Sequence, residues 1–346
     1  MKKIAIILII VIIALAIYTN VKNNDFGDIN NSNYEEKIKV NNSAWTVYWD
    51  TNNIIEEIEI IKNELNDIYL FSTYFDKNDK IVIPQQLLDT YSSVKYEYED
   101  KNFNYYLTFV NDIKYENKSS SLKDTDILYR LLGEDENRQK HINDIISITK
   151  KYGFDGIEID YENIRKDMHL WDVFNKFCKD LYTQAVANNI DVRITLESLT
   201  PFEKLTFSEG PTYAIMCYNL FGISSKPGPK ANTEFLKNVV EKASTLPGKK
   251  EFAIATGGFN WAEGEKTVSL TEKQARKLQI DYNCTAQRDN ESQTLYFQYL
   301  DDADVLHKVF YADSTTLNYW RSIINKSDTY GISIWRLGGN NFNGIE

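Results

Sequence analysis

Four acidic residues lie within one short run of the chain: Asp155, Glu158, Asp160 and Glu162. If this run is a β-strand, successive side chains point to opposite faces, so Glu158, Asp160 and Glu162 share one face. Carboxyl groups that lie so close cannot all ionise, and we expect a shared proton and at least one raised pKa. A carboxyl group that stays protonated near neutral pH is what general acid catalysis requires. The run therefore predicts a proton-transfer site.

The order of the acids along the strand suggests separate roles. Glu162 comes last and should lie nearest the open end of the structure, as the proton donor. Asp160 should lie beneath it as an orienting charge, and Glu158 deeper, as a proton partner. A solvent-exposed edge strand or a divalent-metal site are alternative interpretations. The intervening apolar residues favour a buried strand, and three acids stacked on one strand favour proton handling over metal binding.

From residue 43 onward, short apolar runs alternate with amphipathic stretches. The runs predict eight strands at 44–50, 67–73, 103–110, 154–162, 191–197, 212–218, 251–258 and 331–335. The amphipathic stretches predict helices at 54–65, 84–96, 127–152 with a break near Gly133, 169–189, 232–246 and 314–324. Strands that alternate with helices in this way predict an α/β protein, specifically a (β/α)8 TIM barrel spanning residues 43–346.

One segment interrupts the alternation between the seventh and eighth strands. Residues 260–313 contain a helical stretch at 271–278 and alternating runs at 294–300 and 307–311. They predict a small α+β insertion that forms a wall of the substrate groove, because loops after barrel strands lie at the catalytic end. A doubly wound open sheet is the competing fold. It would favour a glycine-rich phosphate-binding turn, and the sequence contains neither GxGxxG nor a Walker motif.

The N-terminal region reads as an export signal. Two lysines precede an apolar run that extends from residue 4 to 18. We expect residues 1–21 to be a signal or membrane-anchor segment, and the Asn- and Asp-rich residues 22–42 to be a flexible spacer. The rest of the chain is then extracytoplasmic, either anchored or secreted.

Composition excludes some classes of function. The net charge of −11 argues against a nucleic-acid partner, since such proteins normally carry a basic face. No GxSxG or HExxH motif is present, and the three histidines, His141, His169 and His307, have no helically spaced partner. Nothing here indicates an esterase or a metalloprotease.

The carboxylate run resembles the DxxDxDxE signature of glycoside hydrolase family 18, the chitinase-like family. Asp155, Glu158, Asp160 and Glu162 fall on its four acidic positions. Glu158 stands where the family usually has aspartate. The resemblance covers residues 43–346. The insertion is similar to that of a subgroup of bacterial spore-cortex and germination hydrolases, although the LysM repeats common in that subgroup are absent.

Other residues match further motifs of this family. Met216, Tyr218 and Asn219 resemble its MxY(D/N) motif, with asparagine where aspartate is common. Trp335, at the end of the eighth strand, matches a tryptophan that lies under the reactive sugar. Trp261 falls at the start of the insertion. The resemblance implies that these residues contact substrate, and that Tyr218 binds the N-acetyl group of the sugar.

The resemblance also implies a mechanism without metal or organic cofactor. Glu162 would protonate the glycosidic oxygen while the substrate's own acetamido group attacks the anomeric carbon, with Asp160 orienting that group and Asp155 and Glu158 in support. The expected partner is a glycan containing N-acetylglucosamine, such as peptidoglycan, a chitin-like oligomer or an N-glycan, and the expected state is a monomer. The alternative is a non-catalytic lectin on the same fold. Such relatives commonly lack the acid glutamate, which is present here.

Overall fold

The computed structural model describes residues 42–325 and 329–345. The predicted signal or anchor segment 1–21 and the spacer, up to residue 41, lie outside the described residues. Within the described ranges, no helix is both long enough and apolar enough to cross a membrane.

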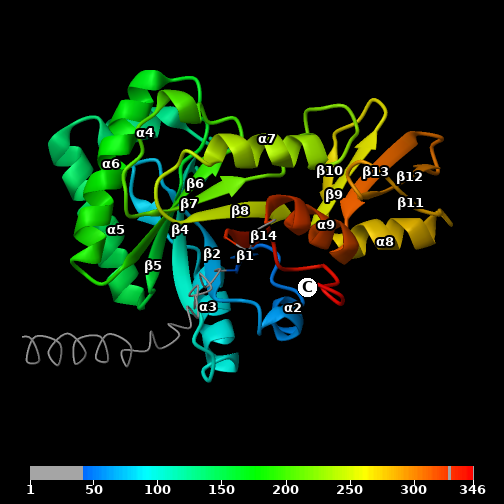
Figure 1. Cartoon of the computed structure of the whole chain (residues 1–346), viewed down its shortest axis with the longest axis horizontal. Helices are drawn as coiled ribbons and strands as arrows, with labels where there is room; N and C mark the ends of the chain where they lie inside the picture. The colour runs from blue at the N-terminus through cyan, green and yellow to red at the C-terminus, as the bar shows by residue number, and fades with distance from the viewer. Residues whose placement is uncertain (1–41, 326–328, 346) are drawn as a thin grey trace, which may run out of the picture. The chain divides into compact units, whose positions relative to one another are not determined.

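Eight parallel strands form a closed barrel (Figure 1), which confirms the predicted fold class. In chain order they are β1 (Ser43–Val47), β2 (Asp67–Phe75), β4 (Asn104–Ile113), β5 (Gly156–Asp160), β6 (Asp191–Glu197), β7 (Thr212–Met216), β8 (Lys250–Ala255) and β14 (Gly331–Trp335). β1 pairs with both β2 and β14, and this pairing closes the barrel. All residues of β1 and β5 are buried, as expected for strands covered on both faces.

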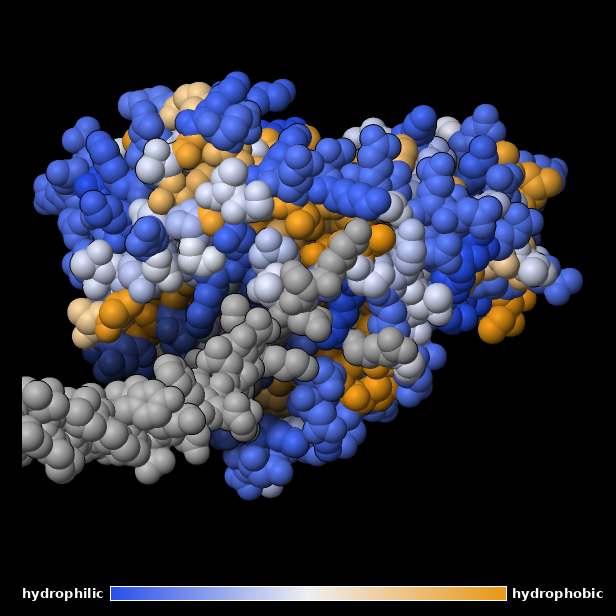
Figure 2. Space-filling view, viewed as in Figure 1, coloured by the Kyte–Doolittle hydropathy of each residue, from blue (hydrophilic) through white to orange (hydrophobic). Residues whose placement is uncertain are grey.

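Helices surround the barrel (Figure 1): α2 (Ile54–Ile61), α3 (Gln85–Glu97), α4 (Thr125–Leu132), α5 (Asp135–Tyr152), α6 (Met168–Val186), α7 (Thr233–Ala243) and α9 (Ser314–Ile324). The predicted break near Gly133 separates α4 from α5. Four of these helices begin at a side chain that accepts a backbone N–H three residues on: Asp124, Asp167, Asn232 and Asp313. The visible outer face is mostly hydrophilic, with apolar residues showing in between (Figure 2).

The structure differs from the sequence prediction at several strand ends. β5 ends at Asp160 and β7 at Met216, so Glu162 and Tyr218 lie in the loops that follow rather than on the strands. A short strand that was not predicted, β3 (Ile81–Val82), forms a hairpin with β2. Loop positions at the carboxyl ends of barrel strands are where functional side chains of this fold gather.

The segment between β8 and α9 forms a second, antiparallel sheet. Its strands are β9 (Gly257–Ala262), β10 (Val268–Leu270), β11 (Gln287–Arg288), β12 (Leu295–Leu300) and β13 (Leu306–Ala312), and α8 (Glu272–Asp281) belongs to the same segment. Ala275 of α8 packs against aromatic side chains of β12 and β13, such as Phe297 and Tyr311. The α+β insertion thus has its own small core, seen beside the barrel in Figure 1.

A buried ion-pair network holds the interior of the barrel together. Arg193 of β6 donates from Nε to Glu158 Oε2 at 2.6 Å, and its Nη1 pairs with Glu251 of β8. The same Nη1 also contacts the hydroxyls of Ser43 and Ser333 at 2.9 and 3.0 Å. The network therefore joins β1, β5, β6, β8 and β14 beneath the open end of the barrel.

We expect the Arg193→Met substitution to destabilise the protein by about 3–5 kcal/mol, because it leaves two carboxylates buried without their cation. Urea unfolding followed by circular dichroism measures the loss. The matched control is Arg130→Met, which breaks the more exposed ion pair between Arg130 and Asp79 and should cost less than about 1 kcal/mol. Equal costs for the two substitutions would contradict the structural role of the network.

Candidate active site

A cavity of about 250 Å³ opens at the carboxyl ends of the barrel strands. Its lining residues lie on seven of the eight barrel strands or in the loops that follow them, so the closure of the barrel is what brings them together. The predicted site residues in the lining are Asp160, Glu162, Met216, Tyr218, Asn219 and Trp335. Residues that the sequence did not single out also line it: Trp45, Phe71, Val110, Asn111, Asp112, Leu122, Lys123 and Thr195.

Glu158 lies below this cavity and is fully buried. Its Oε1 accepts hydrogen bonds from Trp45 Nε1 and Thr108 Oγ1, both at 2.7 Å, and its Oε2 accepts from Arg193. Its carboxylate is therefore occupied by donors and paired with a cation. Glu158 is thus the ion-pair partner of Arg193, and its expected part as a proton partner of Asp160 stays a prediction.

Asp160 ends β5 and is 7% exposed. Its Oδ1 is buried and has no hydrogen-bond partner among the described residues. Burial raises the pKa of Asp160, and the nearby carboxylates of Glu162 and Glu158 raise it further. An unpaired buried polar atom in a native protein calls for an explanation, and at a cavity the natural one is a donor supplied by a ligand.

Glu162 lies two residues past β5, and Asn111 at the end of β4 holds its backbone. Glu162 N donates to Asn111 Oδ1 at 2.9 Å, and Asn111 Nδ2 donates to Glu162 O at 3.1 Å. The carboxylate forms an ion pair with Lys123 at 2.5 Å. Burial raises the pKa of Glu162, Lys123 opposes this, and the carboxylates of Glu197 and Asp112 add to the rise. The expected rise in the pKa of an acid in this run is thus present at Glu162 as well as at Asp160.

Tyr218 and Trp335 close the cavity from the side of β7 and β14. Burial and the carboxylates of Asp160 and Glu162 raise the pKa of Tyr218, so its phenol stays protonated and can donate a hydrogen bond. The Trp335 ring meets Phe71 edge-on, with ring centroids 4.8 Å apart. The indole is thereby fixed in the wall of the cavity. Asn219 lies exposed at the rim.

Two of the predicted site residues lie away from this cavity. Asp155 precedes β5 at the opposite end of the strand, where its Oδ2 accepts a hydrogen bond from Tyr105 N at 2.9 Å and so ties β5 to β4. Trp261 lies in β9 of the insertion, buried among Phe259 and Phe310, and does not line the cavity. The structure assigns Asp155 a contact between strands and Trp261 a place in the packing of the insertion.

Sequence reasoning missed Arg193, Asn111 and Lys123. Arg193 carried a usable signal, because β6 repeats the alternation of β5 and Arg193 is the register partner of Glu158. An inward-facing cation beside an inward-facing acid could have been inferred from the two strands together. Asn111 and Lys123 lie at a strand end and in a loop, where no periodicity identifies the residues that point inward.

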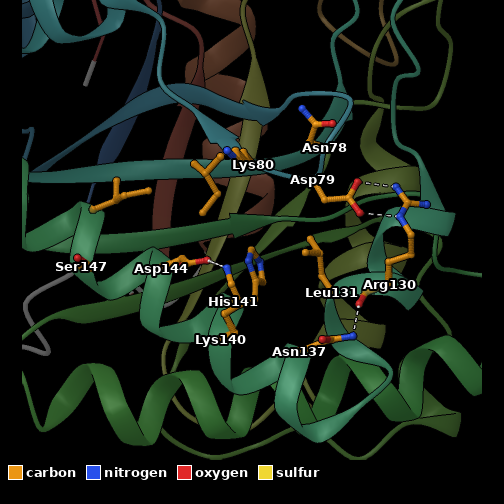
Figure 3. Close-up of a pocket in the computed structure, with 12 residues that line it drawn as sticks. Asn78, Asp79, Lys80, Arg130, Leu131, Asn137, Lys140, His141, Asp144 and Ser147 are labelled. Atoms are coloured by element: carbon orange, nitrogen blue, oxygen red, sulfur yellow. Dashed lines mark hydrogen bonds and ion pairs between the residues drawn. The ribbon is translucent and has the colours of Figure 1, made fainter.

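Charged residues also gather in a hollow of about 710 Å³ on the side of the barrel, against α4 and α5 (Figure 3). There Arg130 forms two hydrogen bonds to Asp79, and Lys140 pairs with Asp144. These charges neutralise one another, unlike the unpaired oxygen of Asp160.

Among the described residues, no group of three or more His, Cys, Asp or Glu side chains is arranged to hold a metal ion.

Comparison with known proteins places this site in context. No family model matches the chain. The cortical fragment-lytic enzyme of Bacillus subtilis (strain 168) is 24% identical over 238 residues, which is 62% of this chain and 54% of that protein. The putative sporulation-specific glycosylase YdhD of the same organism is 22% identical over 229 residues, with the same shares. The chain thus spans about half the length of these curated relatives.

Solved structures agree on the fold. The spore cortex-lytic enzyme SleL of Bacillus cereus superposes with a TM-score of 0.71 at 17% identity, covering 88% of this chain and 72% of that one. A chitinase from Chromobacterium violaceum superposes with a TM-score of 0.72 at 14% identity, covering 88% and 97%. The chain therefore shares the fold of these solved enzymes, as its resemblance to glycoside hydrolase family 18 implied, and is similar in sequence to the cortical fragment-lytic enzyme of Bacillus.

Proposed function

We propose that the chain is a retaining glycosidase that hydrolyses β-linked glycans containing N-acetylglucosamine, with the substrate's own acetamido group as nucleophile. The observation that carries this proposal is the pair of buried carboxyl groups at the cavity. The pKa of each is raised, and Asp160 has an oxygen without a partner. One acid to donate a proton and one to receive an N–H bond is what this reaction needs.

In the first step, Glu162 gives its proton to the glycosidic oxygen and the bond from that oxygen to the anomeric carbon breaks. The acetamido carbonyl oxygen bonds to the anomeric carbon and forms an oxazolinium ion. Asp160 accepts the acetamido N–H through its free Oδ1 and so orients the acetamido group, while the protonated Tyr218 donates to the acetamido oxygen. In the second step, Glu162 takes a proton from water while the water oxygen bonds to the anomeric carbon. The bond from that carbon to the acetamido oxygen breaks, so the oxazolinium ring opens and the configuration is retained.

The names of similar proteins support the choice of substrate class. Relatives in sequence include cortical fragment-lytic enzymes, and a tobacco class V chitinase with the same fold has been solved in complex with NAG4. A peptidoglycan-type or chitin-like glycan suits both. We further propose that the protein acts as a monomer outside the cytoplasm, on the evidence of residues 1–21 and the net charge of −11.

We expect Glu162→Gln to lower the release of reducing ends from N-acetylglucosamine oligomers and from peptidoglycan at least about 100-fold, because the amide cannot donate an acidic proton. Binding of the oligomers, measured by calorimetry, should persist. Glu209→Gln, an exposed glutamate outside the cavity, serves as the matched control. If wild type and Glu162→Gln bind equally and neither cleaves any of these glycans, the chain is a carbohydrate-binding protein instead.

Stability should report the cost of burying Asp160. Below about pH 4 an aspartate is protonated in the unfolded chain as well, so this group adds no pH dependence there. Above that pH the unfolded chain releases the proton while the raised pKa of Asp160 retains it in the folded state, so stability falls as pH rises. The Asp160→Asn variant escapes this loss. Urea unfolding should show that the free energy of unfolding of the variant, relative to wild type, is higher at pH 7 than at pH 4. An equal difference at both pH values would contradict the raised pKa of Asp160.

A further inference from the structure

Lys123 is a residue of the cavity to which neither the carboxylate motif nor the mechanism assigns a part. It lies in the loop between β4 and α4, and its ammonium group reaches the Glu162 carboxylate. The Lys123 side chain is 50% exposed and that of Glu162 is 13% exposed. An ion pair between two exposed side chains contributes little, but here one partner is buried and carries the proposed proton transfer.

The loop backbone sets Lys123 in place independently of its side chain. Lys123 has a φ of 53°, in the left-handed region that is strained for most residues, and its N–H donates to Asp112 Oδ1 at 2.8 Å. The next residue, Asp124, donates its N–H to Asn111 O at 2.9 Å and caps α4 through its carboxylate. Ser121 pairs with Ile113 through two backbone hydrogen bonds. Strained residues that several hydrogen bonds hold in place are common at functional sites, so this loop favours a functional part for Lys123.

Asn111 holds both members of the ion pair in register. Its side chain bonds the backbone N–H and carbonyl of Glu162, and its Nδ2 also donates to the carbonyl of Asp124, next to Lys123, at 3.0 Å. Asn111 is almost fully buried. The two chain segments that carry the carboxylate and the ammonium group are therefore clamped by a single amide.

The groups that face Glu162 are mostly acidic. They are Asp160 on β5, Glu197 at the end of β6, Asp112 at the end of β4 and the phenol of Tyr218 after β7. Burial and the carboxylates of Glu197 and Asp112 favour the protonated form of Glu162. Lys123 is the cation that opposes them. Burial lowers the pKa of Lys123, but Glu162, Asp160 and Glu197 raise it by more, so the ammonium form persists.

We propose that Lys123 is a positioning residue for Glu162. Its positive charge opposes the effect of burial and of the acidic neighbours, so that the Glu162 carboxyl group can give up a proton and then take one back. The role of Glu162 in this inference rests on the proposed function. Burial favours the protonated form of Glu162, which is the form that the first step needs. The second step needs the carboxylate form. Lys123 stabilises that form, and it can turn away when the glycosidic oxygen arrives because its side chain is half exposed.

Three variants test this in the full chain. Lys123→Met removes the charge and keeps most of the side-chain bulk, Lys123→Arg keeps the charge, and Lys118→Met removes a lysine from the same loop. Lys118 is exposed and lies over the ring of Tyr115, 3.8 Å from its centroid, away from the carboxylates. Thermal unfolding verifies that all three variants fold as wild type does.

The first readout is the pH profile of kcat/KM on an N-acetylglucosamine oligomer, whose alkaline limb reports deprotonation of the acid in the free enzyme. Without Lys123 the acid stays protonated to higher pH. The ratio of kcat/KM at pH 8 to that at pH 6 should therefore rise at least about threefold in Lys123→Met. Lys123→Arg and Lys118→Met should keep the wild-type profile. A Lys123→Met profile equal to that of wild type, or an equal shift in Lys118→Met, would overturn the proposal.

The second readout does not depend on catalysis. The side-chain carboxyl of Glu162 can be followed by NMR in protein labelled with 13C at glutamate, and assigned as the resonance that Glu162→Gln lacks. Its titration midpoint should move to higher pH in Lys123→Met and return towards wild type in Lys123→Arg. An unchanged midpoint rejects the role of Lys123 even in an active enzyme. A shifted midpoint in a protein that cleaves no glycan supports the coupling and rejects the proposed function instead.

Discussion

Inside the barrel, the Arg193 guanidinium donates to Glu158 and pairs with Glu251, and its face lies over the rings of Tyr69 and Trp45, at 3.6 and 4.4 Å from their centroids. A cation buried so deeply is tolerated because two carboxylates balance its charge and its Nε and Nη1 atoms are hydrogen-bonded. The network fixes the Glu158 side chain through three hydrogen bonds. Asp160 and Glu162 lie above this network, and burial together with neighbouring carboxylates raises the pKa of each.

The same constraint explains why three acids from one short run of the chain can have three different roles. Glu158 is neutralised by a guanidinium, Asp160 keeps an unpaired oxygen, and Glu162 meets the ammonium group of Lys123 at the open end. Their spacing is uniform along the chain, but their surroundings are not. Depth in the barrel and the nearest cation distinguish them, and the role of each as support, orienting charge or proton donor follows from that difference.

Sequence reasoning went as far as local patterns could take it. The alternation of apolar runs and amphipathic stretches was enough to predict the barrel, the break near Gly133 and the insertion before α9. The run that ends at Glu162 was enough to predict that Glu158 and Asp160 point into the barrel, although β5 ends at Asp160 and Glu162 follows in the loop. It could not show that Glu158 would be paired with Arg193, because that pairing joins different strands through their register. The contact between Lys123 and Glu162 could not be predicted from the sequence, because a loop and the hydrogen bonds of Asn111 bring the two residues together.

The motif strand also shows what a resemblance alone does not fix. Asp155 matches the first acidic position, yet it binds the backbone at the far end of the strand, and Trp261 lies in the insertion against Phe259 and Phe310 rather than in the cavity. A motif identifies residue types, whereas the fold decides which of them reach the cavity where the glycan is proposed to bind. The site proposed here is accordingly built around Glu162, Asp160, Tyr218 and Trp335, with Asn111 and Lys123 holding the acid.

The central claim is that Glu162 works with the acetamido group of the substrate, and the configuration of the first product tests it most directly. Proton NMR of an N-acetylglucosamine oligomer during its early hydrolysis distinguishes the two anomers before they interconvert. The account predicts that the new reducing end appears as the β-anomer, because the bond is broken and remade on the same face. Release of the α-anomer would mean that water attacks directly from the opposite face, and would contradict the roles assigned to both carboxyl groups.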